Sequence, residues 1–193
     1  ACCRPEKNLG LEENLHITRH IVEAVSVPVM ADGEDGFGDA SVIGDTIGRY
    51  LEVGVAGINL EDQVLGLPKG STQVVDCQFM VDKITAARKA AAAAGHPDLF
   101  INGRTDALSA AKDRTSGLKE AIGRANRYLR AGADLAFVTG VIKLEEVKLL
   151  VKEIAGPVSI STGTHHNVNL SIDELKQCGV ARVSLPTLAV FAS

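Results

Sequence analysis

The sequence predicts a parallel α/β fold, and three observations carry this prediction. Short apolar runs that end in polar or charged residues recur along the chain of 193 residues and indicate buried strands. Segments with helical periodicity fill the gaps between the runs, and the spacing suits the roughly 30 residues of a βαβ unit. Aromatic residues make up only 4% of the chain, while Ala, Gly and Val are abundant, as in folds whose helices pack closely on a parallel sheet.

The apolar runs define six expected strands. They cover residues 28–32, 56–61, 99–104, 134–139, 157–161 and 181–185. Parallel strands place their carboxyl ends at the same rim of a sheet, and ligands bind at that rim in such folds. We therefore expect the functional residues among the polar side chains that end the runs.

Four helices are marked by the glycine that follows each of them. They are expected at residues 40–53, 79–94, 118–131 and 172–178, before Gly54, Gly95, Gly132 and Gly179. Glycine suits the left-handed residue that commonly closes a helix. The similar sequences at 54–57, 132–134 and 179–181 indicate one helix-to-strand turn that is used three times.

Composition excludes several classes of protein. The chain carries 20 basic and 24 acidic residues and is 46% hydrophobic, which suits one folded domain with its own core. No apolar run approaches the ~18 residues of a membrane span, and no stripe of Lys and Arg indicates a nucleic-acid partner. The cysteines are irregularly spaced and no secretory signal is recognisable, so we expect reduced thiols and a cytoplasmic location. The four cysteines are Cys2, Cys3, Cys77 and Cys178, of which the last two are expected to be packed rather than catalytic.

Acidic side chains gather at the ends of the first runs. Asp32, Glu34 and Glu61 are the expected ligands of a divalent metal, because like charges brought together are costly unless a cation lies among them. Oxygen ligands without His or Cys favour a hard ion such as Mg²⁺. The alternative is that Asp35 and Asp39 cap the following helix and that the other carboxylates are solvated loop charges.

The glycines at positions 33, 36 and 38 do not indicate a nucleotide-binding loop. Their spacing differs from that of a dinucleotide fingerprint, and no Walker lysine follows them. The acids of this loop would also repel phosphate groups. We therefore exclude nucleotide binding here.

Four segments together resemble the isocitrate lyase and phosphoenolpyruvate mutase superfamily. They are residues 28–39 (PVMADGEDGFGD), 54–63 (GVAGINLEDQ), 101–107 (INGRTDA) and 124–134 (RANRYLRAGAD). The resemblance implies a (β/α)₈ TIM-type barrel, a Mg²⁺ or Mn²⁺ ion at the carboxyl ends of the strands, and chemistry beside a 2-oxo acid. It implies that small carboxylic or phosphonic acids are the substrates, and that the protein is a homotetramer.

The resemblance also implies roles for individual residues. Asp32 would be the direct metal ligand, and Glu34, where many members have Asp, would hold metal-bound water together with Glu61. Arg104 would meet the anionic end of the substrate or its enolate. A chelated metal and a guanidinium place positive charge where an enolate develops negative charge, so the chemistry agrees with these roles.

The loop after the second run departs from the lyase pattern. Isocitrate and methylisocitrate lyases carry Lys-x-Cys-Gly-His at this place, and residues 64–73 (VLGLPKGSTQ) contain neither the Cys nor the His. The Pro68–Lys69 pair resembles the gating loop of phosphoenolpyruvate mutase, so Lys69 is a catalytic candidate that would cover the substrate; the alternative is a solvated loop lysine.

Four further positions complete the comparison with the superfamily. His165 and His166, in the loop 161–167, are candidates for a proton carrier or a pocket wall, with an ordinary loop as the alternative. Thr139 stands where isocitrate lyases have a glutamate, which argues against a tricarboxylic substrate. Glu6 is a candidate for the remaining acidic position of the metal site.

We therefore expect a Mg²⁺-dependent lyase that makes or breaks a C–C or P–C bond beside a 2-oxo acid through an enolate. The alternatives are a hydrolase or decarboxylase of oxaloacetate or phosphonopyruvate, and a non-catalytic binding protein. A (β/α)₈ barrel typically needs ~250 residues and eight strands. Because the first run matches the third strand of the superfamily, residues 1–193 are expected to form a single barrel domain that lacks its first two strands and C-terminal helices.

Overall fold

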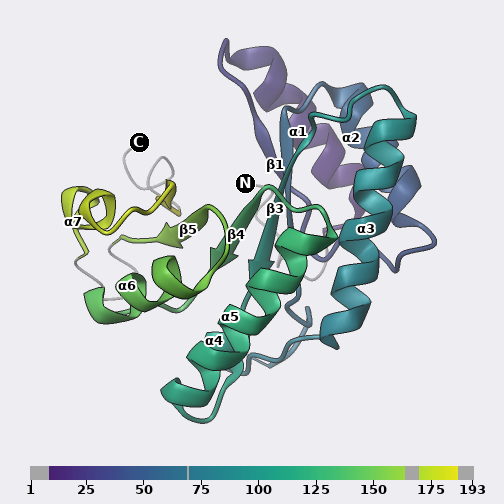
Figure 1. Ribbon diagram of the computed structural model, residues 1–193. Helices are drawn as coiled ribbons and strands as arrows, with labels where there is room; N and C mark the ends of the chain where they lie inside the picture. The colour runs from purple at the N-terminus through teal and green to yellow at the C-terminus, as the bar shows by residue number, and fades with distance from the viewer. Residues whose placement is uncertain (1–8, 69, 164–169, 187–193) are drawn as a thin grey trace.

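The computed structural model describes residues 9–68, 70–163 and 170–186, which form a curved parallel sheet with helices along it (Figure 1). The sheet has six strands in chain order, and every neighbouring pair is parallel. They are β1 (Met30–Asp32), β2 (Gly57–Glu61), β3 (Phe100–Thr105), β4 (Leu135–Val138), β5 (Val158–Ser161) and β6 (Arg182–Ser184). All six expected strands are confirmed to within a few residues. Among the described residues, β1 and β6 each pair on one side only.

Seven helices of the described chain connect or precede the strands. They are α1 (Leu11–Ala24), α2 (Ile43–Val53), α3 (Cys77–Ala93), α4 (Ala107–Ala110), α5 (Arg114–Ala131), α6 (Leu144–Glu153) and α7 (Ile172–Gln177). The longer helices pack side by side in the order of the strands. The four expected helices are confirmed, and the φ angles of their closing glycines are 92° (Gly54), 84° (Gly95), 113° (Gly132) and 86° (Gly179).

Two helices begin earlier than the sequence pattern indicates. The Asp76 side chain accepts hydrogen bonds from the backbone N–H groups of Gln78 and Phe79, and so starts α3 at Cys77. Asp113 starts α5 in the same way by accepting from the Ser116 N–H. A side chain at Gly117 would meet the Ala111 Cβ at 2.7 Å, so this glycine allows α5 to pack closely on the segment after α4.

The two faces of the sheet differ in polarity because side chains alternate along a strand. One face is apolar and lies under the helices; it includes Ile58, Leu60, Ile101, Val138 and Ile160, all buried. The other face carries polar side chains from the same strands. The helices therefore cover the apolar face, and a functional site can form only on the polar face. Within the described residues, no helix is both long enough and apolar enough to cross a membrane.

A buried carboxylate ties the ends of β2 and β3 to α5. Asp62 is fully buried, and it accepts hydrogen bonds from the hydroxyls of Thr105 and Tyr128, both at 2.7 Å, and from the Asp106 N–H at 2.9 Å. The Arg124 guanidinium lies 3.2 Å away. Burial of Asp62 raises its pKa in spite of these donors. This network holds the carboxyl ends of the two strands that carry most of the polar rim.

Candidate active site

The parallel register aligns the side chains of the polar face in two rows across the sheet. The first row contains Asp32, Asn59 and Asn102. The second row contains Glu61, Arg104, Phe137, Ser159 and Arg182. Residues of one row lie on the same face of the sheet, so these side chains share a single site although they come from distant parts of the sequence.

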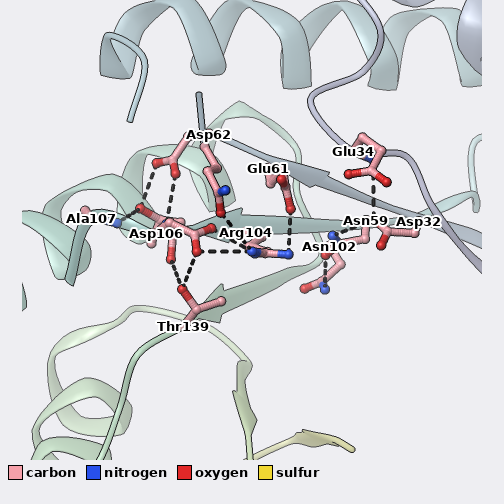
Figure 2. A network of polar contacts seen from close by, with 12 residues as sticks. Asp32, Glu34, Asn59, Glu61, Asp62, Asn102, Arg104, Asp106, Ala107 and Thr139 are labelled. Atoms are coloured by element: carbon pink, nitrogen blue, oxygen red, sulfur yellow. Dashed lines mark hydrogen bonds and ion pairs between the residues drawn. The ribbon is translucent and has the colours of Figure 1, made fainter. Parts of the chain in front are cut away.

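Three carboxylates converge at the β1 and β2 side of this site (Figure 2). Asp32, Glu34 and Glu61 each offer an oxygen, and these oxygens all lie within 4.8 Å of one another. Asp32 is exposed, whereas Glu34 and Glu61 are buried. The structure therefore brings together the three side chains that the sequence predicts as metal ligands.

The loop after β1 folds against β2 and so places Glu34. The Gly33 N–H donates to the Asn59 carbonyl at 2.9 Å, and the Glu61 N–H donates to the Glu34 carbonyl at 2.9 Å. A Cβ at Gly33 would lie 2.6 Å from the Ile58 side chain, so only glycine allows this close approach. Glu34 has a positive φ of 50°, an uncommon conformation that is often found at functional sites.

Asp35 and Asp39 do not cap α2, so the capping alternative is wrong for these side chains. Helix α2 begins after Val42, which makes no side-chain cap. Asp35 instead accepts from the Phe37 N–H at 3.0 Å, and Asp39 accepts from the Ser41 N–H at 2.8 Å. Both aspartates fold the loop locally, because a short carboxylate can accept a hydrogen bond from the backbone two residues further on.

A buried lysine also holds this loop. Lys83 projects from α3, is only 2% exposed and donates a hydrogen bond from Nζ to the Asp35 carbonyl. Burial lowers the pKa of Lys83, while the neighbouring Asp35 and Asp39 act in the opposite direction. The Lys83 side chain thus connects helix α3 to the loop that carries Glu34.

Arg104 lies between two carboxylates of the rim. Its guanidinium forms ion pairs with Glu61 at 2.6 Å and with Asp106 at 2.8 Å (Figure 2). Thr139 donates to the other oxygen of Asp106 at 2.8 Å and fixes that carboxylate in turn. Burial acts to lower the pKa of Arg104, but Asp106 and Glu61 hold it above its ordinary value. Arg104 is therefore a fixed positive charge beside the triad.

The triad favours a bound cation. The pKa of Glu61 is raised to about 8, chiefly by burial; Arg104 opposes this rise, and Asp106, Asp32 and Glu34 add to it. The negatively charged form of Glu61 is therefore unfavourable in this site, even with Arg104 beside it. Three carboxylate oxygens without a nitrogen or sulfur ligand are the donors that Mg²⁺ and Mn²⁺ prefer. The residues present therefore fit a hard divalent ion.

A cavity of about 730 Å³ opens over the polar face. Every strand, or the segment that follows it, contributes to its wall. One lining residue from each strand in turn is Asp32, Asn59, Arg104, Phe137, Ser161 and Arg182. The size and polarity of this cavity suit a small polar ligand.

The sequence profile of the family described as phosphoenolpyruvate phosphomutase matches residues 2–193. The chain belongs to this family. It is 40% identical over 151 residues to 2,3-dimethylmalate lyase of Eubacterium barkeri, covering 77% of this chain and 50% of the relative. It is 30% identical over 189 residues to 2-methylisocitrate lyase of Aeropyrum pernix, covering 96% and 58%. It is 35% identical over 135 residues to oxaloacetate decarboxylase of Rhodopseudomonas palustris, covering 69% and 44%.

Solved structures of the superfamily share the fold. A putative phosphonomutase from Burkholderia cenocepacia superposes with a TM-score of 0.84 at 30% identity, over 95% of this chain and 74% of the other. A 2,3-dimethylmalate lyase described as a member of the PEP mutase/isocitrate lyase superfamily has a TM-score of 0.84 at 28% identity, covering 96% and 63%. The six strands therefore form the curled part of a TIM-type barrel. The chain spans about half the length of the curated relatives it matches.

Other candidate residues from the sequence fall into two groups. Lys69, His165, His166 and Glu6 lie outside the described residues. Cys77 and Cys178 are half-buried, pack against the two apolar clusters and do not line the cavity. Burial raises the pKa of the Cys77 thiol, which disfavours a reactive thiolate. For these two cysteines the expected packed state is observed.

Asn59, Phe137 and Arg182 line the cavity from inside their strands and were not predicted from the sequence. We expected functional residues only at the ends of the apolar runs. A signal for two of them was present, because Asn59 and Arg182 are polar positions that alternate with apolar ones within a strand. Phe137 gave no such signal, since an aromatic residue in a buried strand is ordinary.

Proposed function

We propose that this protein is a Mg²⁺- or Mn²⁺-dependent lyase that makes or breaks a C–C or P–C bond beside a 2-oxo acid. The convergence of Asp32, Glu34 and Glu61 beside Arg104, at the edge of a polar cavity, is the observation that carries this proposal. Membership of a family whose curated relatives are named lyases and mutases supports it.

The three carboxylates are the proposed metal-holding residues. Asp32 reaches the cavity and is exposed, so it is the proposed direct ligand. Glu34 and Glu61 would hold the ion through water. A bound Mg²⁺ would supply a Lewis acid that polarises the 2-oxo group and lowers the energy of the enolate. Asn59 donates to the Asp32 carboxylate at 3.4 Å and helps to orient it.

Arg104 is the proposed catalytic residue of the described rim and also a substrate contact. Its ion pairs with Glu61 and Asp106 keep the guanidinium at the cavity wall before the substrate arrives. A preorganised positive charge stabilises an enolate oxygen without a reorganisation cost at the moment of reaction. Lys69 and His166 stay proposed as the residues that cover and line the bound substrate.

A hydrolase or decarboxylase of oxaloacetate is the second candidate. The segment 64–73 contains no cysteine to serve as the acid or base of isocitrate lyases, and one relative is named oxaloacetate decarboxylase. Product analysis separates the reactions. Glyoxylate or pyruvate together with a carboxylic acid indicates a lyase, acetate with oxalate indicates a hydrolase, and pyruvate with CO₂ indicates a decarboxylase.

We also propose that the domain is one barrel whose closure needs strands beyond the six described. The outer edges of β1 and β6 pair with no strand in the described part of the chain, and a closed barrel of this type has eight strands. Strands between those two edges would complete the wall of the cavity opposite Arg104.

Calorimetry tests the proposed function directly. We expect Mg²⁺ to bind the purified protein and oxalate, a mimic of the enolate, to bind only when Mg²⁺ is present. A protein that binds neither would overturn the proposal. If a screen of 2-oxo and 2-hydroxy acids finds turnover that survives the Arg104→Ala substitution, Arg104 is not catalytic.

A further inference from the structure

Arg182 is a positively charged residue on the cavity wall. It lies on the last strand of the sheet, whereas the acidic triad lies at the first two strands. It lies on β6, in the same row as Glu61 and Arg104, and lines the cavity. Its side chain is half-buried. The Nη1 atom donates to the Ser159 hydroxyl at 3.1 Å, and the guanidinium carbon lies 5.8 Å from the centre of the Phe137 ring.

Arg182 differs from the arginines that form an ion pair with a carboxylate. Those arginines are Arg49, Arg88, Arg104, Arg114 and Arg124. Arg182 has no carboxylate partner within the described ranges of the chain. Burial lowers its pKa, and no acidic neighbour in the described part of the chain offsets this effect.

Partial burial of a guanidinium without an anionic partner costs free energy, and the geometry of Arg182 indicates which ligand would offset this cost. Ser159 uses one hydrogen of Nη1, and the partner is a neutral hydroxyl. The edge formed by Nε and Nη2 makes no hydrogen bond with the described residues. Two parallel N–H groups on one guanidinium edge match the two oxygens of a carboxylate.

Arg104 also lies beside the Phe137 ring, but unlike Arg182 it already has carboxylate partners among the described residues. Its guanidinium carbon is 5.9 Å from the Phe137 centre, but its N–H groups already bind Glu61 and Asp106. The cavity therefore has two unlike ends. The end at β1 to β3 gathers carboxylates and suits a cation, and the end at β6 offers an unneutralised guanidinium.

We propose that Arg182 binds a second carboxylate of the substrate, so that the protein selects 2-oxo acids with two carboxylates over those with one. This inference rests on the proposed function, because the 2-oxo end of the substrate is assigned to the carboxylate triad. A single guanidinium beside a neutral hydroxyl balances one negative charge, which favours a carboxylate over a doubly charged phosphonate. Phe137 holds the aliphatic part of the substrate between the two ends.

The test compares diacids with monoacids of the same length. Calorimetry at saturating Mg²⁺, by displacement of oxalate, uses oxaloacetate against 2-oxobutanoate, 2-oxoglutarate against 2-oxopentanoate, and 2-oxoadipate against 2-oxohexanoate. A charge-assisted hydrogen-bonded pair predicts that the diacid of at least one length binds about tenfold to 100-fold more tightly than its partner. The Arg182→Met substitution is expected to reduce this preference to less than about twofold, with Mg²⁺ and oxalate binding unchanged.

Two further variants keep the test decisive. Arg182→Gln retains a donor for Ser159 and removes the charge, so it replaces Arg182→Met if that variant does not fold. Arg19→Met removes the same charge from the exposed face of α1 and is expected to keep the full preference. The inference is wrong if wild-type protein binds Mg²⁺ and oxalate but shows no diacid preference, or if the preference survives in both Arg182 variants. Failure to bind Mg²⁺ or oxalate overturns the proposed function as well.

Discussion

At the scale of single residues, charge is distributed unevenly along the polar rim. Glu61 is 2% exposed and contacts Arg104, yet two other carboxylates lie within 4.8 Å of it. Arg104 is shared between Glu61 and Asp106, so it cannot neutralise the whole cluster. Excess negative charge at one end of the cavity is therefore a property of these particular side chains.

The first prediction concerns the Glu61 carboxylate. Glu61→Gln keeps the size of the side chain and removes its charge, so we expect Mg²⁺ affinity to fall by about 10- to 100-fold. At neutral pH the metal-free variant should unfold close to the wild-type temperature, because a pKa of about 8 leaves Glu61 mostly neutral in the wild-type protein as well. Calorimetry and thermal unfolding provide the two measurements. Glu145→Gln, at an exposed position of α6, serves as the matched control.

The second prediction follows from the pKa of Glu61, about 8 in the metal-free protein. Below that pH the carboxyl is protonated, and a metal must displace the proton to bind. Mg²⁺ affinity should therefore fall by roughly tenfold for each pH unit below 8 and level off above it. Titrations at pH 6.5, 7.5 and 8.5, in buffers of different ionisation enthalpy, measure both the affinity and the released proton. An affinity that does not change with pH would contradict this reading of Glu61.

At the scale of elements, the loop between β1 and α2 depends on contacts from two neighbours. Backbone hydrogen bonds in both directions join the loop to strand β2, and Lys83 of α3 donates a further hydrogen bond to it. The loop is held in a conformation that gives Glu34 and Phe37 positive φ angles. Such a conformation persists only when surrounding contacts outweigh its local strain.

The third prediction tests this support by Lys83→Met. The substitution keeps an apolar stem of similar length and leaves the Asp35 carbonyl without its donor. A lost buried hydrogen bond is worth about 1–3 kcal/mol, so Mg²⁺ affinity should fall by about tenfold while the helices stay folded. Amide hydrogen exchange of residues 33–39 should rise at the same time. Lys89→Met, at an exposed position of the same helix, is expected to leave both quantities unchanged.

At the scale of the whole molecule, the polar rim is anchored to the helical layer by Asp62. Its carboxylate joins the ends of β2 and β3 to two side chains of α5, Arg124 and Tyr128. The Asp106 N–H also donates to Asp62, so the network fixes the backbone of the residue whose side chain pairs with Arg104. It therefore couples global stability to the geometry of the Arg104–Asp106 pair.

The fourth prediction is that Asp62→Ala lowers the free energy of unfolding by about 3 kcal/mol or more. Removing one member of a buried ionic network leaves Arg124 and several hydrogen-bond donors without compensation. Tyr128→Phe removes a single donor and should cost about 1 kcal/mol. Urea unfolding measures both. If Asp62→Ala lowers the free energy of unfolding by less than Tyr128→Phe does, Asp62 does not organise the network.

Much of the fold was predictable because its signals are local. The apolar runs at residues 56–61 and 134–139 predicted β2 and β4, and Gly54 and Gly132 marked the ends of α2 and α5. The starts of α3 and α5 were not predictable to the residue, because Asp76 and Asp113 cap them through hydrogen bonds that only the folded backbone provides. Asp35 and Asp39 were open to a capping interpretation for the same reason.

The sequence by itself determined the order of strands and helices and the gathering of Asp32, Glu34 and Glu61 near one rim, because strand ends in a parallel sheet share an edge. Only the tertiary structure decided which charges are paired. Parallel register aligns Glu61, Arg104 and Arg182 although they are far apart in the chain. The folded contacts then pair Arg104 with Glu61 and Asp106 and leave Arg182 without a carboxylate partner among the described residues. Pairing of charges depends on distances across strands, and no local pattern in a sequence contains those distances.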